Sequence, residues 1–187
     1  MLGGLGRIWE MSKAHKANIY PTLETERLHL RPFTAADGDA LYTLYGDPRV
    51  MSIRKIGLQS RAQSDAQLRE ILQHWCQHGF GLFAAIEKAD GTFLGECGLR
   101  HIAPDSDESE LSYGLVPQAW GRGYATEAAA AALAHGLDEL GLKTIYAIAR
   151  ADNFRSHRVM QKLGMRLVEE ADKGETRIVR YAIHQPD

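Results

Sequence analysis

Two glycines, Gly121 and Gly123, stand directly before the clearest helical segment of the chain, residues 124–140, which is rich in alanine. The segment before them, residues 110–116, has the composition of a strand and stops at Pro117. The chain therefore passes from a strand to a helix through a glycine turn. In open α/β sheets, ligands bind at such junctions, beyond the carboxyl ends of the strands.

Glycines in this turn permit positive φ angles and let a ligand approach the backbone closely. The first turn of a helix also has amide groups without intrahelical partners, and its dipole favours anions. A diphosphate placed here would accept hydrogen bonds from the amides of residues 121–126, and Arg122 would add a positive charge. The alternative is a tight turn with no ligand. The turn lacks the Lys-Ser/Thr of a P-loop, and no G-x-G-x-x-G follows a first strand, which disfavours nucleotide hydrolysis and dinucleotide binding.

The remaining chain alternates between strand and helix patterns. Capping boxes at Thr34 and Ser64 predict two helix starts, residues 50–59 look irregular, and Asp90-Gly91 indicates a hairpin turn. The predicted order is β-α-α-β-β-β-α-β-α-β-β. It indicates an α/β (α+β) fold with a mixed, mostly antiparallel central sheet and helices on both faces. The predicted strands are 26–33, 80–87, 92–100, 110–116, 143–149, 165–169 and 177–184, and the predicted helices are 34–45, 64–78, 124–140 and 153–163.

The length of 187 residues suits one domain, predicted at 22–187 after a flexible tail at 1–21. Lysine and arginine number 22 against 24 acidic residues, so no basic excess favours a nucleic-acid partner. No apolar run is long enough for a membrane span, and a cytoplasmic protein is the default expectation. The two cysteines, Cys76 and Cys97, cannot form a paired CxxC metal site; a disulfide is possible on count, but we expect both to be small buried residues.

Residues 110–127 resemble the acetyl-CoA motif of the GNAT acetyltransferase superfamily, whose core pattern is Q/R-x-x-G-x-G/A. Gln118-x-x-Gly121-x-Gly123 matches in letters. We prefer Trp120-x-x-Gly123-x-Ala125, because its distance from Pro117 fits and the RimJ/RimL-like subgroup commonly has W-G-x-G-Y-A-T-E-A. Two further segments resemble this subgroup: one is Thr25–Pro32, and the other is Asn153-x-x-Ser156 followed by Lys162–Met165. Together the matches span about residues 22–170.

The resemblance implies an N-acetyltransferase that moves the acetyl group of acetyl-CoA to a primary amine, without a metal, as a monomer or homodimer. The acceptor would be a protein N-terminus or a small molecule. In this superfamily the strand before the turn and the strand after the helix splay apart, and the pantetheine arm fills the gap like an added strand. The cofactor-binding residues implied are Tyr113, Leu115, Gly121, Arg122, Gly123, Tyr124, Ala125, Thr126, Asn153 and Ser156, with Ser156 near the thioester sulfur.

The reaction needs a base, since an alkyl amine is mostly protonated at neutral pH. Our candidate is Glu110, at the start of the strand before the turn. The alternative is that it is a solvated carboxylate at a loop edge. Glu96 is a rival because an acid in an apolar strand needs a partner or a function. His101 and His157 are further options.

The acid that would protonate the leaving thiolate is less defined. Many superfamily members have a tyrosine where this chain has Met160, which has no proton to donate. Ser156 is our catalytic candidate, Tyr113 or Tyr124 could replace it, and the thiolate could also leave unaided. The missing tyrosine motivates a second hypothesis, a non-catalytic acyl-CoA sensor or interaction domain; a third is a binder of another phosphorylated ligand.

The acceptor side is expected along residues 50–60 and the helix at 64–78. This part of the chain has four cationic residues, Arg49, Arg54, Lys55 and Arg61. They either favour an acidic acceptor or form a solvated face.

Overall fold

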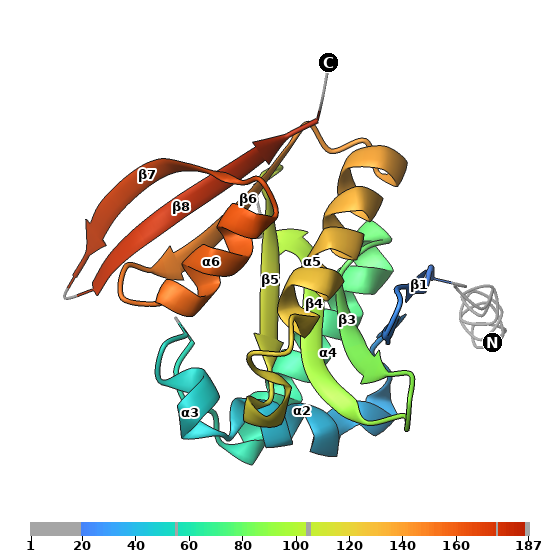
Figure 1. Cartoon of the computed structure of the whole chain (residues 1–187). Coiled ribbons are helices and arrows are strands. Elements are labelled where there is room, and N and C mark those ends of the chain that lie inside the picture. Colours follow the sequence, from blue (N-terminus) through green and yellow to red (C-terminus); the bar gives the residue numbers. More distant parts are fainter. Residues whose placement is uncertain (1–19, 55, 104–105, 175, 186–187) are drawn as a thin grey trace, which may run out of the picture.

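The computed structural model describes residues 20–54, 56–103, 106–174 and 176–185. Its centre is one eight-stranded sheet with the order β1-β2-β3-β4-β5-β6-β8-β7 (Figure 1). Only β5 and β6 pair in parallel, and every other neighbouring pair is antiparallel, which confirms the predicted mixed sheet. The strands are β1 (Leu23–Glu24), β2 (Leu28–Pro32), β3 (Leu82–Glu87), β4 (Phe93–His101), β5 (Ser109–Leu115), β6 (Thr144–Arg150), β7 (Arg166–Lys173) and β8 (Thr176–His184).

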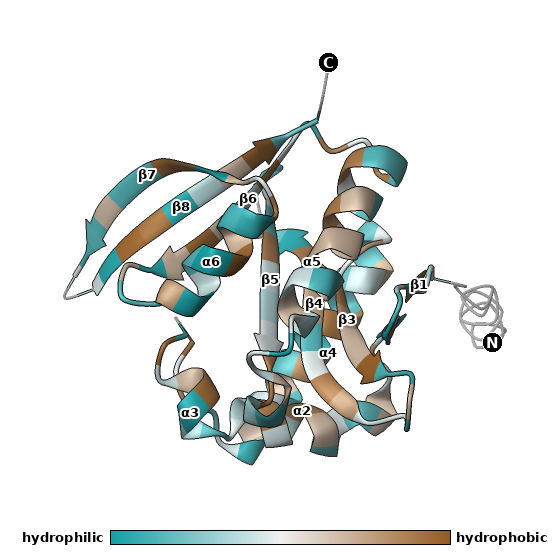
Figure 2. Ribbon diagram, viewed as in Figure 1, coloured by the Kyte–Doolittle hydropathy of each residue, from teal (hydrophilic) through white to brown (hydrophobic). Residues whose placement is uncertain are grey.

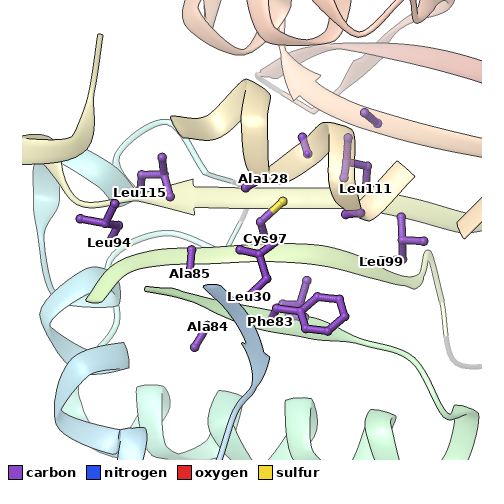
Figure 3. Packing of buried hydrophobic residues seen from close by; sticks show 14 of the residues in the cluster. Leu30, Phe83, Ala84, Ala85, Leu94, Cys97, Leu99, Leu111, Leu115 and Ala128 are labelled. Carbon is purple, nitrogen blue, oxygen red and sulfur yellow. The ribbon is translucent and has the colours of Figure 1, made fainter. Parts of the chain in front are cut away.

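Helices cover both faces of this sheet. In Figure 3 the strands around Cys97 lie between α5 on one side and α4 on the other. The helices are η1 (Ala35–Asp37), α2 (Gly38–Tyr45), α3 (Pro48–Met51), α4 (Arg61–His78), η2 (Pro117–Ala119), α5 (Tyr124–Ala134), η3 (His135–Glu139) and α6 (Phe154–Lys162). Within the described residues, none of them is long and apolar enough to cross a membrane.

The core lies between the helices and the middle strands. Side chains such as Leu30, Phe83, Cys97 and Leu111 are almost fully buried there (Figure 3). Figure 2 shows brown, hydrophobic residues along β3 and α5. Both cysteines are free thiols, but Cys76 is exposed, so the expectation that both are buried is wrong for Cys76.

The start of α4 differs from the prediction. Ser60 is the N-cap: its hydroxyl accepts from the amide of Gln63 at 3.3 Å, and the Gln63 side chain accepts from the Ser60 amide at 2.8 Å. Ser64, the predicted cap, is buried inside the helix. The pattern Ser-x-x-Gln occurs twice in a row, and the earlier copy forms the cap, which lengthens the helix by nearly a turn.

Two other predicted boundaries need correction. Part of the irregular stretch 50–59 belongs to α3, where Asp47 caps the helix and Val50 and Met51 are buried. The helix predicted over 124–140 is α-helical only to Ala134 and continues as the π turn η3. A Cβ on Gly136 would come within 2.4 Å of Leu99 Cδ1, so the glycine lets this turn pack tightly on the sheet.

The described part of the chain begins at Tyr20, within the predicted tail. Residues 1–19 of the predicted tail lie outside the described residues. Tyr20 already packs on the domain, with its ring centroid 5.0 Å from that of Trp75. The short strand β1, which follows, pairs with β2.

Candidate active site

The glycine turn between η2 and α5 presents open backbone. Gly121 and Gly123 have φ angles of +74° and +85°, which side-chain-bearing residues rarely adopt. Nothing lies within 4 Å of where a Cβ on Gly121 would sit. The amide of Glu127 donates to the Gly123 carbonyl at 3.1 Å, the first bond of α5. The backbone N–H groups that precede Glu127 have no helical carbonyl four residues earlier to bond, so they are available to an anion.

Trp120 braces this turn against the end of β5. Its indole N–H donates to the carbonyl oxygen of Leu115 at 2.8 Å. The guanidinium of Arg155 lies 4.6 Å from the centre of the Trp120 ring, a cation–π contact between α6 and the turn. The side chain of Trp120 thus fixes the turn, while the backbone of residues 121–126 remains open.

A second brace comes from the N-terminal segment, and the sequence analysis assigned it no role. The carboxylate of Glu127 accepts from the Thr25 hydroxyl at 2.6 Å and from the amide and Nε of Arg27 at 2.8 and 2.7 Å. Burial raises the pKa of Glu127, but the bonds from Thr25 and Arg27 outweigh it, and the net pKa is lowered. Arg27 also donates to the Arg122 carbonyl at 2.9 Å. Glu127 therefore stays ionised and holds the N-terminal segment, about a hundred residues away, against the turn.

Tyr124, at the start of α5, is fixed in the same brace. Its ring lies between Arg27 and Arg122, whose guanidinium carbons are 4.4 and 4.8 Å from the ring centre. Its hydroxyl donates to Glu87. These contacts give Tyr124 a structural role at the turn and provide no link to Ser156.

The strands β5 and β6 part above their first residues. Ser109 pairs with Ile145 and Glu110 with Tyr146, and no further pair joins the described residues of these strands. On the other edge of β5, Val116 donates to the Leu94 carbonyl at 2.8 Å. Hydrogen-bonded pairs alternate along antiparallel strands, so the backbone groups of Tyr113 and Leu115 point away from β4 and toward β6. The resemblance to the GNAT superfamily implied an extended arm in a gap of this kind.

Tyr113 and Ser156 meet across this gap. The Tyr113 hydroxyl lies 2.7 Å from the Ser156 hydroxyl and donates to the Ser156 carbonyl at 3.2 Å. Burial raises the pKa of Tyr113, with a smaller opposing effect from Ser156, so the phenol stays protonated. Asn153 caps α6 by accepting from the Ser156 amide at 3.2 Å. Met160, in the usual tyrosine position, is fully buried.

The opposite face of β5 has a second polar group. Residues alternate between faces, so Glu110, Ser112 and Gly114 lie opposite Tyr113 and Leu115. Both bonds from Arg100, at 2.8 and 2.5 Å, reach the same oxygen of Glu110, Oε1. Glu110 is thus a mostly buried carboxylate that pairs with Arg100 through Oε1, while Oε2 takes no part in that pair. It is not the solvated carboxylate at a loop edge that the alternative interpretation described.

Glu96 lies on the same face and is fully buried. Its Oε1 accepts from Arg54 at 2.6 Å and its Oε2 from the Tyr45 hydroxyl at 2.5 Å. A Cβ on Gly114 would lie 1.9 Å from Nη1 of Arg54, so the glycine makes room for this guanidinium. Both oxygens of Glu96 are engaged, which favours Glu110 over Glu96 as a proton acceptor.

Comparison with known proteins identifies the fold and its family. The Acetyltransferase (GNAT) domain family matches residues 27–166, most of the chain and all of the elements that build the turn and the gap. The chain belongs to the GNAT acetyltransferase family. It is therefore an acetyltransferase enzyme with the mixed sheet of that family.

Individual GNAT relatives agree with this assignment. The chain is 30% identical over 150 residues to an uncharacterized N-acetyltransferase, YoaA, of Bacillus subtilis, covering 78% of this chain and 83% of that protein. It is 30% identical over 158 residues to the FsC-acetyl coenzyme A-N(2)-transacetylase of Aspergillus fumigatus, covering 80% and 66%. A crystal structure of an acetyltransferase from Agrobacterium tumefaciens superposes with a TM-score of 0.78 at 31% identity, covering 88% of this chain and 95% of that one.

The cations of the segment where the acceptor is expected are paired within the chain, as far as the structure describes them. Arg54 pairs with Glu96, Arg49 with Asp47, and Arg61 with Asp39 and Asp65. Lys55 lies outside the described residues. Arg54 is mostly buried in its pair, whereas Arg49 and Arg61 are exposed and pair with carboxylates at the surface, which fits the alternative of a solvated face for these two.

The two histidine candidates lie in different places. His157 on α6 donates from Nε2 to the Arg150 carbonyl at 3.1 Å. His101 ends β4 and contacts two other histidines on α4. Neither has a contact with the Tyr113–Ser156 pair among the described interactions. The roles of Arg27, Glu127 and Tyr45 were missed because their partners are distant in the chain, and that of Arg100 because its pairing depends on the register of β4 with β5.

Proposed function

We propose that this acetyltransferase transfers the acetyl group of acetyl-CoA to a primary amine by direct attack within a ternary complex. The observation that carries the proposal is the gap between β5 and β6, which opens toward the glycine turn. A molecule with a diphosphate and an extended amide-containing arm matches both parts. The relative from Aspergillus fumigatus has acetyl coenzyme A in its name, which supports the same donor.

The donor would bind along one continuous path. Amides of residues 121–126 would hold the diphosphate, with Arg122 adding charge. The pantetheine arm would add as a strand to the backbone of Tyr113 and Leu115, whose groups point into the gap. The thioester would then lie near Ser156, and Asn153 has amide N–H groups left to donate to the arm.

The two faces of β5 would supply the proton transfers. Glu110, on one face, would accept the proton of the amine directly or through a water molecule. The lone pair of the amine attacks the thioester carbonyl, the C–S bond breaks as the tetrahedral intermediate collapses, and the sulfur leaves as the thiolate of CoA. The Ser156 hydroxyl, supported by Tyr113 from the other face, would donate a proton or hydrogen bond to that sulfur.

The acceptor is a primary amine, either a protein N-terminal α-amine or a small molecule. The RimJ/RimL-like subgroup, which favours the protein N-terminus, remains a prediction from the motif. With Arg49, Arg54 and Arg61 paired internally, a neutral acceptor surface fits the described residues better than a basic one. A panel of peptides and small amines with a thiol-release readout identifies the class.

Isothermal titration with acetyl-CoA tests the binding site. Gly123→Glu adds bulk and negative charge at the turn and should weaken binding by at least about 100-fold, or ~2.7 kcal/mol. Gly141→Glu is the matched control, because Gly141 has a similar positive φ of +67° at the other end of the same helical segment. It should bind like the wild type. Equal affinity for all three proteins would rule out the turn as the diphosphate site.

The competing hypothesis is a non-catalytic acyl-CoA sensor. It shares the donor site, so binding alone does not separate the two. Tight acetyl-CoA binding without thiol release across the amine panel would favour the sensor. Titration with ATP and NAD in competition with CoA addresses the third hypothesis, a binder of another phosphorylated ligand.

A further inference from the structure

Three histidines from two elements converge at the end of α4. His74 and His78 lie one turn apart in the last two turns of that helix, and His101 is the last residue of β4. Each offers one ring nitrogen, and these nitrogens lie within 4.8 Å of one another. The ring centroids are 4.5 Å apart for His74 and His78 and 4.6 Å apart for His78 and His101.

The proton on His74 can be placed from its partner. Nδ1 lies 2.8 Å from the carbonyl oxygen of Phe80, and a carbonyl only accepts, so Nδ1 has the proton. Nε2 therefore has the lone pair, and it accepts a long bond of 3.2 Å from the His101 amide. A carbonyl on one ring nitrogen is the usual second partner of a metal-binding histidine. A metal at Nε2 would replace the long bond from the His101 amide, because the nitrogen has a single lone pair.

His101 adds an independent signal. Its Nδ1 is buried and has no hydrogen-bond partner in the described part of the chain. Buried polar atoms almost always have a partner, and the exceptions call for one that the protein alone does not supply. His78 is exposed, so its ring can adjust to a ligand without disturbing the core.

We propose that His74, His78 and His101 form a binding site for a divalent transition metal, with Zn²⁺ as the first choice. Imidazole nitrogen is a preferred ligand of zinc, and three protein ligands leave a fourth position for water. Zn–N bonds of about 2.1 Å place tetrahedral ligands about 3.4 Å apart, so small ring movements suffice. This site departs from the expectation of a protein without metal. It shares no residue with the proposed donor site or with Glu110, and it would use His101, one of the base options, as a metal ligand instead.

The metal would join α4 to β4. Three bonds would tie the end of the helix to the last residue of the strand, and binding to the folded state alone raises its stability. The other explanation is an aromatic cluster with Phe80, whose ring centroid lies 5.1 Å from His74 and 5.3 Å from His101. A cluster of that kind would not bind metal stoichiometrically.

Titration calorimetry with ZnCl₂ on metal-stripped protein, with any affinity tag removed, distinguishes the two. We expect one Zn²⁺ per chain, a higher melting temperature with Zn²⁺, and visible d–d absorption when Co²⁺ replaces Zn²⁺. His78→Ala removes an exposed ligand and should weaken binding at least about 100-fold, the upper range for losing even an outer-shell partner of a ligand. His101→Ala should do the same.

Two controls keep the result specific. Cys76→Ala removes an exposed thiol between the two helix histidines, and His29→Ala removes a histidine on β2 that pairs with Glu24. Both should bind Zn²⁺ like the wild type. The proposal fails if wild-type protein binds no stoichiometric Zn²⁺, if His78→Ala binds it unchanged, or if Cys76→Ala abolishes binding. Because the readouts are metal affinity, absorption and melting temperature, they are independent of the proposed acetyl transfer.

Discussion

The indole nitrogen of Trp120 and the carbonyl oxygen of Leu115 are 2.8 Å apart, joined by a hydrogen bond that ties the glycine turn to the end of β5. Leu115 is the last residue of β5, at the end away from Ser109 and Glu110, where the described residues of this strand pair with β6. The family motif commonly has glutamine or arginine where this chain has Trp120. Here the side chain acts as a brace within the protein.

Trp120→Phe tests this brace. The phenyl ring keeps an aromatic surface for Arg155 but leaves the Leu115 carbonyl without its indole donor. We expect the free energy of unfolding to fall by about 1 kcal/mol, the typical value of one hydrogen bond. Acetyl-CoA should also bind several-fold more weakly, because the turn loses its fixed position. Urea unfolding measures the first effect and titration calorimetry the second. Wild-type values in both would show that the Trp120 side chain does not fix the turn.

Glu110→Gln tests the base. The change preserves shape and removes the proton acceptor, so kcat should fall about 100-fold, within the usual range for general-base catalysis. Affinity for acetyl-CoA should stay the same, since Glu110 lies on the face of β5 away from Tyr113. Steady-state thiol release and calorimetry give both numbers. An unchanged kcat would exclude Glu110.

Glu96→Gln should act mainly on stability. Glu96 is fully buried and neutralises Arg54, whose side chain is mostly buried as well. Removing the charge leaves Arg54 buried without a counter-ion, which costs about 3 kcal/mol. Urea unfolding measures the loss, and the double change Glu96→Gln/Arg54→Gln should recover part of it. Loss of kcat in a still-folded Glu96→Gln, with Glu110→Gln active, would instead make Glu96 the base.

Ser156→Ala and Tyr113→Phe test the leaving-group side. A thiol has an ordinary pKa near 8.5, so its thiolate leaves readily, and we expect kcat to fall only about tenfold in either variant. The double variant should lose little more, because the two hydroxyls form one hydrogen-bonded unit. Independent, multiplicative losses would mean that the two residues act separately.

Asp37→Asn tests a pH-dependent cap. Burial raises the pKa of Asp37, but bonds from Arg31 and Thr34 outweigh it and hold the pKa below its ordinary 3.8. A carboxyl whose pKa is lower in the folded than in the unfolded protein stabilises the fold. The contribution is complete at pH values above the unfolded-state pKa and is lost as the pH falls through the folded-state pKa. Asp37→Asn should therefore cost about 1 kcal/mol at neutral pH, with the deficit shrinking below pH 3.8. A deficit independent of pH in urea unfolding would contradict this.

The features that the sequence predicted well are local. The glycine turn, the alanine-rich helix and the Thr34 capping box depend on residues close together in the chain, and all three formed. The predicted start of α4 was wrong because two identical patterns competed and only tertiary packing chose between them. The π turn at 135–139 likewise depends on Gly136 meeting Leu99 and Ile145 from other elements.

The arrangement of charges was beyond prediction. Glu127 holds Thr25 and Arg27, about a hundred residues away, and Arg54 reaches Glu96 across 42 positions. Helical or strand periodicity contains no information about such pairs. The partner of Arg54 was therefore not predictable, whereas Arg49 pairs with the nearby Asp47, and Arg61 with Asp65 one helical turn away, on the surface.

The two register pairs between β5 and β6 have a mechanical consequence. They are the only backbone pairs, within the described residues, between the part of the sheet formed by β1 to β5 and the part formed by β6, β8 and β7, and side-chain contacts such as Tyr113 with Ser156 supply the rest of the link. A ligand that occupies the gap as an extra strand would add backbone hydrogen bonds between these two parts of the sheet. Amide hydrogen exchange along β6 should slow when such a ligand binds, while exchange in β3, at the interior of the part formed by β1 to β5, should stay unchanged.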